Sequence, residues 1–181
     1  TQQAPFLMGI IVSVLMGIIL TLPISSAALG IILGLEGLAA GAATVGCCAN
    51  MIGFAVASYR ENKMNGLLAQ GLGTSMLQIG NIMRKPVIWF PAIITSAILG
   101  PVASAVLKMV SNPVGSGMGS AGFVGQISAY TCMVETGTAK STAFILILLM
   151  HFILPGIVTL LISEVMRKKN WIKPGDMKLN I

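Results

Sequence analysis

The chain has 181 residues, of which 55% are hydrophobic and only 9% are charged. Soluble domains carry about 25% charged residues, so this composition excludes an ordinary water-soluble globule. It also excludes intrinsic disorder, which needs low hydrophobicity, and a nucleic-acid partner, which needs a dense basic patch. The net charge of +6 comes from 11 basic and 5 acidic side chains, so the positions of these few charges carry most of the information.

Charged residues divide the chain into uncharged segments that are long enough to cross a lipid bilayer. A transmembrane helix needs about 20 mostly apolar residues, and only helices or closed β-barrels satisfy the backbone inside lipid. Barrel strands alternate apolar and polar residues, whereas residues 144–150 read FILILLM. We therefore expect an all-α, polytopic membrane protein with about four transmembrane helices. They are predicted at Phe6–Leu22, Gly37–Tyr59, Pro86–Leu107 and Ser141–Ser163.

Glu36 is the first charge in the chain, and it interrupts an apolar run that covers residues 27–59. As a single helix this run would be about 50 Å long at ~1.5 Å per residue, which exceeds a bilayer core of roughly 30 Å. We expect a helix break beside Glu36, with its carboxylate either at a functional discontinuity inside the protein or in solvent at the membrane edge. The following span is rich in Gly and Ala, which predicts close helix packing rather than contact with lipid.

Met64–Met83 and Met109–Val134 are also long enough to span, but both are rich in glycine and neutral polar residues. A glycine inside a helix costs about 1 kcal/mol relative to alanine, so neither segment is expected to form one continuous helix. Irregular backbone persists at membrane depth only where it is buried in protein or lines a watery cavity. We predict two re-entrant or broken segments, with ordinary loops outside the membrane as the alternative.

Basic residues predict the orientation. If Phe6–Leu22 leaves the cytoplasm and the later spans alternate, nine of the eleven Lys and Arg residues become cytoplasmic, as the positive-inside rule requires. Both termini are then cytoplasmic, and residues 164–181 form a basic tail on a single transmembrane domain that covers residues 1–181. The two Gly-rich segments enter from opposite sides, an arrangement typical of transporter binding sites.

Two further ionisable residues are candidates for function. His151 lies in the last predicted span, four residues before Pro155, and a proline at that spacing frees the carbonyl of residue 151 from its helical bond. A histidine that packs against a neighbouring helix is the alternative. Glu135 follows the second Gly-rich segment, where it either lines the mouth of that segment or belongs to a loop.

Neutral hydrogen-bonding side chains are concentrated in the two Gly-rich segments. Such groups bind sugar hydroxyls without the desolvation cost of charges, which favours a polyol or another neutral polar solute over an ion. With the three ionisable residues Glu36, Glu135 and His151, the predicted substrate-binding set comprises Gln70, Thr74, Ser75, Gln78, Asn112, Ser116, Ser120 and Gln126.

Two other patterns in the sequence do not indicate a function. Residues 117–122 match GxGxxG, but no predicted strand precedes them and no acidic residue follows at the distance that dinucleotide binding requires. Cys47 and Cys48 are adjacent and Cys132 is isolated, which is not the spacing of zinc ligands. We predict no catalytic residues, no cofactor and no metal site.

Several phrases of the sequence resemble one family. They are GLAAGAATVGC (37–47), GFAVASYREN (53–62), AQGLGTSMLQIGNI (69–82), PVIWFPAIITSAILGPVA (86–103) and NPVGSGMGSAGFVGQI (112–127). They are similar to enzyme IIC-like membrane proteins of the bacterial phosphotransferase system, in the group that includes the perfringolysin regulatory protein. Members of this group are longer, so the chain looks like their C-terminal portion.

The resemblance implies a multi-pass permease in the bacterial cell membrane that moves or senses a sugar-like solute. It also implies a homodimer and separate cytoplasmic phosphotransferase components that carry the phosphate. Two hypotheses follow. The chain is a solute-translocating permease component, or it is a membrane-embedded regulator that binds a ligand or a partner without transport.

Overall fold

A computed structural model describes residues 4–180. Four long helical stretches occupy the positions of the four predicted spans. In chain order they are α1 (Pro5–Thr21), α3 (Gly37–Ala57), the continuous series η3 (Pro86–Trp89), α6 (Phe90–Pro101) and η4 (Val102–Val106), and the continuous series α9 (Lys140–Leu148), η6 (Leu149–Ile153) and α10 (Leu154–Lys168). Residues 37–57, 86–106 and 140–168 are long and apolar enough to cross a membrane, and α1 is a shorter apolar helix.

The two Gly-rich segments fold back on themselves as helical hairpins, and neither is one continuous helix, as predicted. The first hairpin comprises α4 (Tyr59–Leu68), η1 (Ala69–Gly73), η2 (Ser75–Gln78) and α5 (Ile79–Arg84). The second comprises α7 (Pro113–Met118), η5 (Ala121–Phe123) and α8 (Val124–Glu135), and a short helix α2 (Ser26–Ile32) packs against α7. Over residues 4–180 the helices are joined by turns and loops, with no strand and a single bridge between Gly37 and Ser111, which confirms the all-α prediction.

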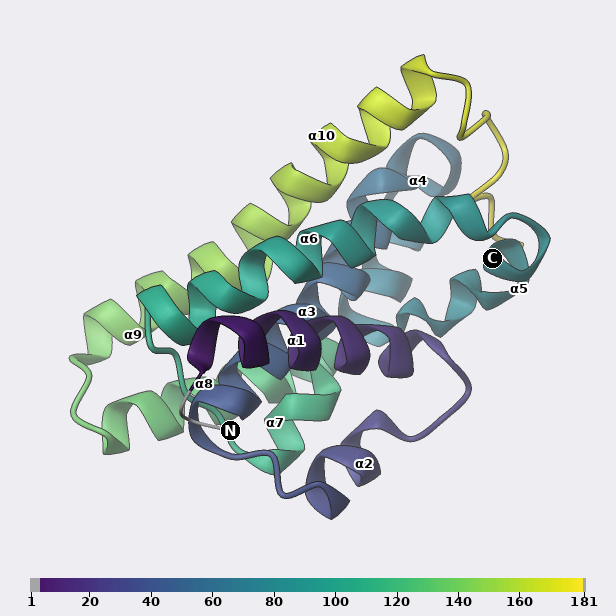
Figure 1. The fold of residues 1–181 in the computed structure, drawn as a ribbon. Helices are drawn as coiled ribbons and strands as arrows, with labels where there is room; N and C mark the ends of the chain where they lie inside the picture. The colour runs from purple at the N-terminus through teal and green to yellow at the C-terminus, as the bar shows by residue number, and fades with distance from the viewer. Residues whose placement is uncertain (1–3, 181) are drawn as a thin grey trace.

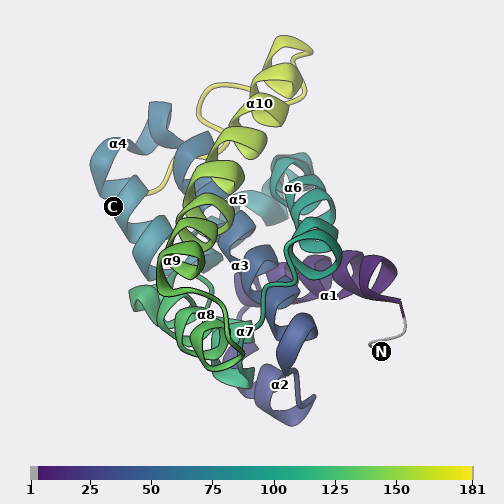
Figure 2. The same cartoon turned by 90° about the vertical axis from the view of Figure 1, so that its left-hand side faces the viewer.

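Helix α3 is the centre of the bundle, in contact with α1, α6, α7 and α10 (Figures 1 and 2). Small side chains allow α3 to approach its neighbours closely. An added Cβ at Gly41 would overlap the carbonyl of Met109, and one at Gly46 would overlap the backbone of Ser13 on α1. Nearly every residue from Ala40 onward in α3 is buried. The predicted close packing of this Gly/Ala-rich helix is therefore confirmed.

Helices α1 and α6 run in opposite directions. Ser104, near the end of the α6 series, donates a hydrogen bond to the Pro5 carbonyl at the start of α1 over 2.7 Å. Ser13, in the middle of α1, donates to the Ser96 carbonyl over 2.8 Å. Residue numbers thus rise along α1 as they fall along α6.

Helix α3 is also antiparallel to α6. Gly41 packs against Met109, just after the α6 series ends, while the Ser96 hydroxyl donates to the Gly46 carbonyl over 3.3 Å. Since both helices oppose α6, α1 and α3 run in the same direction. The connection through α2 returns the chain to the starting end of the bundle before α3 begins.

This parallel arrangement corrects the predicted topology, in which Phe6–Leu22 and Gly37–Tyr59 cross in opposite directions. The start of α1 lies at the end of the bundle where α3 begins and α6 finishes. Nine Lys and Arg residues lie in or beside α4, α5 and the end of α10, at the other end, which we call the basic end. The start of α1 and the end of α10 therefore lie at opposite ends of the bundle, whereas both termini were predicted to lie on one side (Figure 1).

A proline adjoins each π-helical turn of the long helices, and for η6 the proline explains the irregular turn. Pro101 immediately precedes the π-helical η4, and Pro155 follows the π-helical η6, which contains His151. A proline removes one donor and its ring crowds the carbonyl four residues earlier, and a π-turn accommodates the extra space this requires. The kink predicted at His151 is therefore a wide helical turn.

Candidate functional site

The two hairpins meet at their tips, halfway along the bundle. The Ser120 hydroxyl in the second hairpin donates a hydrogen bond to the Gly71 carbonyl in the first over 2.5 Å, and it also contacts Met51 Sδ of α3 at 3.5 Å. The Ser120 side chain is fully buried. We call this contact the tip junction; it brings together two segments that are 49 residues apart in the chain.

Local sequence shapes both tips. In the first, Thr74 is extended and interrupts the helix, and its hydroxyl accepts a bond from the Met76 amide at 3.1 Å. In the second, Gly119 has a φ of +54°, and a Cβ there would lie 2.7 Å from the Cβ of Cys47. Positive φ favours glycine and the close approach requires it, so the second tip reaches α3 because this residue has no side chain.

A neutral polar network adjoins the tip junction on the α1 side of α3. Ser75 and Thr21 share a hydrogen bond of 2.8 Å, and Thr21 donates to Asn50 Oδ1 over 3.4 Å. Trp89 Nε1 donates to the same Asn50 oxygen over 3.0 Å, and Asn50 Nδ2 donates to the Ser96 hydroxyl over 3.3 Å. Every one of these five side chains is uncharged, so the network offers hydroxyl and amide partners without fixed charge.

Sequence reasoning placed Ser75 in the binding set but missed Thr21 and Asn50. The sequence contains a signal that could have identified both residues. Asn50 is the one amide side chain in the Gly37–Ala57 helix, and a polar group inside an otherwise apolar span indicates an internal partner. Thr21 closes the first span in the same way, where the apolar pattern ends.

Gln126 and His151 lie together on another face of α3. Gln126 Nε2 is 3.1 Å from His151 Nδ1 and 3.4 Å from Cys48 Sγ. Both side chains are buried, and Gln126 Oε1 and His151 Nε2 have no protein partner. His151 is thus hydrogen-bonded to a neighbouring helix through Nδ1, while its second nitrogen, Nε2, is buried without a protein partner.

Glu36, Asn112 and Glu135 line one pocket of about 260 Å³ at the end of the bundle where α3 begins. Glu36 is the residue before α3, so the predicted helix break is confirmed, and both carboxylates are exposed. Asn112 caps α7 by accepting a bond from the Gly115 amide at 2.8 Å. Within residues 4–180, no three His, Cys, Asp or Glu side chains form a group that could hold a metal ion.

The remaining members of the predicted set form hydrogen bonds within or beside the hairpins. Gln78 Nε2 donates to Gln70 Oε1 over 2.9 Å and so joins the two legs of the first hairpin, and Gln70 Nε2 donates to the Ser58 hydroxyl over 2.9 Å. Ser116 donates to the Pro113 carbonyl within α7 over 2.6 Å. Along α3, the predicted residues follow one another from the Glu36 pocket through the tip junction to the Gln70–Gln78 pair.

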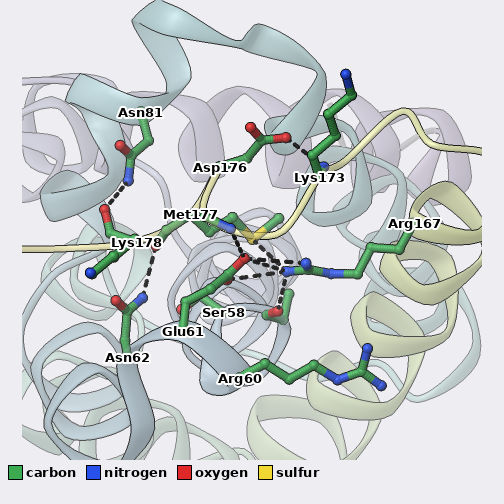
Figure 3. Close-up of polar contacts among 12 residues, drawn as sticks. Ser58, Arg60, Glu61, Asn62, Asn81, Arg167, Lys173, Asp176, Met177 and Lys178 are labelled. Carbon is green, nitrogen blue, oxygen red and sulfur yellow. Dashed lines mark hydrogen bonds and ion pairs between the residues drawn. The ribbon is translucent and has the colours of Figure 1, made fainter.

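Charged groups gather at the basic end (Figure 3). Arg167 forms an ion pair with Glu61 at 3.2 Å, and Lys85 pairs with Asp176. Partial burial alone would raise the pKa of Asp176. Hydrogen bonds from Lys85 and from the Lys173 amide, with the charges of both lysines, outweigh this effect and hold the pKa below its ordinary value.

This shift predicts acid sensitivity at the basic end. Because the folded state favours ionised Asp176, its contribution is fully present above its unfolded pKa of 3.8 and is lost as pH falls through the lower folded value. We expect the melting temperature of Asp176→Asn to lie below that of the unsubstituted protein at neutral pH, and the difference to shrink at about pH 3. A difference that is constant down to this pH would contradict the prediction.

Comparison with known proteins adds one finding. A family model described as "Phosphotransferase system, EIIC" matches residues 1–179. No curated protein and no solved structure gave a significant match.

Proposed function

Because the chain belongs to the phosphotransferase system EIIC family, we propose that it is a permease component that translocates a neutral, sugar-like solute across the bacterial cell membrane. Family membership and the three long apolar helices support a membrane permease related to the phosphotransferase system. The solute class is inferred from the chemistry of the site.

The tip junction is the observation that carries this proposal. Two broken segments that enter a helical bundle from opposite ends and meet at its centre are the arrangement expected for a transporter site. Ser120, Ser75, Thr21 and Asn50 place hydroxyl and amide groups at this point. Buried neutral groups of this kind suit a ligand with many hydroxyls, since neither side must desolvate a charge.

The charge distribution supports an orientation. Nine basic residues lie at the basic end, and Lys108 and Lys140 lie near the other end, where α6 finishes and α9 begins. By the positive-inside rule, the basic end is cytoplasmic. The first hairpin then enters from the cytoplasm and the second from outside, while the start of α1 is external and the end of α10 is cytoplasmic.

Family membership suggests two kinds of protein partner. We propose that separate cytoplasmic phosphotransferase components meet the basic end, because this chain offers no residue pattern for carrying phosphate. We also propose that two copies form a homodimer in the membrane. Exposed apolar side chains along α9 and α10, such as Phe144, Ile145 and Leu161, provide surface for lipid or for a second copy.

Transport by the tip junction is tested with Ser120→Ala in proteoliposomes. Each net hydrogen bond is worth about 1 kcal/mol, so loss of the Ser120 hydroxyl from a site used during translocation should lower counterflow by roughly fivefold or more. Labelled hexoses, hexitols and disaccharides would serve as the solutes. Ser128→Ala, in the return leg of the same hairpin, is the matched control and should leave counterflow unchanged.

The outcome separates the two hypotheses. Binding of a sugar that depends on Ser120, without any counterflow, would favour the regulator that binds a ligand but does not transport it. Neither binding nor counterflow with any neutral solute of the panel would contradict the proposed solute class. Equal counterflow in Ser120→Ala and Ser128→Ala would contradict the proposed site.

A further inference from the structure

Residues 170–180, which we call the strap, leave the end of α10 and lie across the basic end of the first hairpin (Figure 3). Two bonds to Asn62 fix the strap on the first leg of the hairpin. Asn62 Nδ2 donates to the Met177 carbonyl over 2.8 Å, and Asn62 Oδ1 accepts from the Leu179 amide at 2.7 Å. The Gly175 amide adds a bond of 3.1 Å to Glu61 Oε1 on the same leg.

The strap is bonded equally to the second leg. Gln78 Nε2 donates to the Met177 carbonyl over 3.0 Å, Asn81 Nδ2 donates to the Lys178 carbonyl over 2.9 Å, and Lys85 pairs with Asp176. The Met177 carbonyl therefore accepts from both legs at once. A segment that bridges both legs restrains their separation, which contacts to a single leg would not do.

Apolar contacts complete the attachment. The side chains of Ile172 and Met177 are almost fully buried, with 1% and 0% exposure. They belong to a cluster with Ile82 and Ile88, which lie in and just after the second leg, and with Phe54 of α3. The strap thus closes the interior at the basic end, below the Gln70–Gln78 pair.

The first hairpin needs an external restraint because its own backbone is irregular. It contains a π-turn, a 3-10 turn and the extended Thr74 between them, and Gly73 and Gly80 face open space. Segments with few regular backbone bonds open at low free-energy cost. The bonds that hold the strap are made largely by amide side chains to backbone carbonyls, a set that can break and re-form without moving the long helices.

We propose that the strap is a latch: while bound it holds the two legs of the first hairpin together and seals the tip junction from the basic end, and its release opens that route. This inference rests on the proposed permease function for its purpose. Its test does not, because accessibility can be measured without any solute.

The experiment measures alkylation of Ser75→Cys by a polar maleimide, with the protein in nanodiscs so that both faces are open to reagent. Ser75 is fully buried, so labelling should be slow. Adding Asn62→Ala removes both strap bonds of this side chain and should speed labelling at least tenfold. Asn65→Ala, an exposed asparagine on the same helix, is the matched control and should have no effect.

A second position distinguishes a latch from general loosening. Ser13 on α1 is equally buried but lies away from the hairpin. The latch requires that Asn62→Ala speeds labelling of Ser75→Cys and leaves Ser13→Cys slow. Equal acceleration at both positions would mean that Asn62 only stabilises the fold, and no acceleration at Ser75→Cys would mean that the strap does not close the route. Either result overturns the latch.

Discussion

Gly46→Ala is expected to prevent the chain from reaching its folded state. A methyl group at this position of α3 would overlap the carbonyl oxygen, the carbonyl carbon and the Cα of Ser13 on α1. These are backbone atoms within a helix, so relief requires α1 to move as a unit, which would break the Ser13 bond to the Ser96 carbonyl. Overpacking of a well-packed core costs about 1–3 kcal/mol even where side chains can adjust, and here the obstacle is backbone.

Gly156→Ala on α10 is the matched control. A Cβ at this position would lie 3.5 Å from Val56 and 3.7 Å from Ile52, which is ordinary contact. Alanine is favoured over glycine in a helix by about 1 kcal/mol, so this variant should fold as well as the parent or slightly better. The yield of monodisperse protein in detergent and its melting temperature measure both effects. A normal yield and melting temperature for Gly46→Ala would show that α1 does not pack against α3 as described.

The sequence predicts the helices well because hydropathy and glycine content act locally. The four long stretches and both broken segments lie where their compositions place them, and Glu36 marks a real break. The predicted direction of α1 was wrong, and the reason can be identified. Residues 1–35 carry no charge, so reversing α1 moves no basic residue across the membrane, and the positive-inside rule has no information about it.

The same locality limits prediction of the site. Ser75 and Ser120 could be singled out as polar groups in Gly-rich segments, but their positions beside Asn50 and Gly71 depend on long-range packing. Gln70 and Gln78 were predicted as ligand groups; in the structure they are bonded to each other, and Gln78 is also bonded to the strap, so the ligand role stays a prediction. Sequence identifies which residues are polar and buried; only the fold decides whether a neighbour already satisfies them.

Arg167→Met is expected to cost about 3–5 kcal/mol of unfolding free energy, because it leaves Glu61 charged and buried without its cation. The two side chains are only 10% and 8% exposed, and the guanidinium also donates to the Ala57 carbonyl over 3.2 Å. The Glu61 carboxylate would keep one bond, from the Gly175 amide. One neutral donor does not replace a paired charge in a site of low polarity.

The double variant Glu61→Met/Arg167→Met should be more stable than Arg167→Met alone, since an apolar pair of similar volume removes both desolvation costs.

Arg60 provides the control. It forms an ion pair with Glu164 at 3.1 Å, nearly the same distance, but its side chain is 69% exposed, so Arg60→Met should cost no more than about 1 kcal/mol. Equal losses for Arg60→Met and Arg167→Met in denaturation by urea or heat would show that burial does not govern this pair. Arg167→Met also breaks the charged link between α10 and the strap, because Glu61 binds both Arg167 and the Gly175 amide.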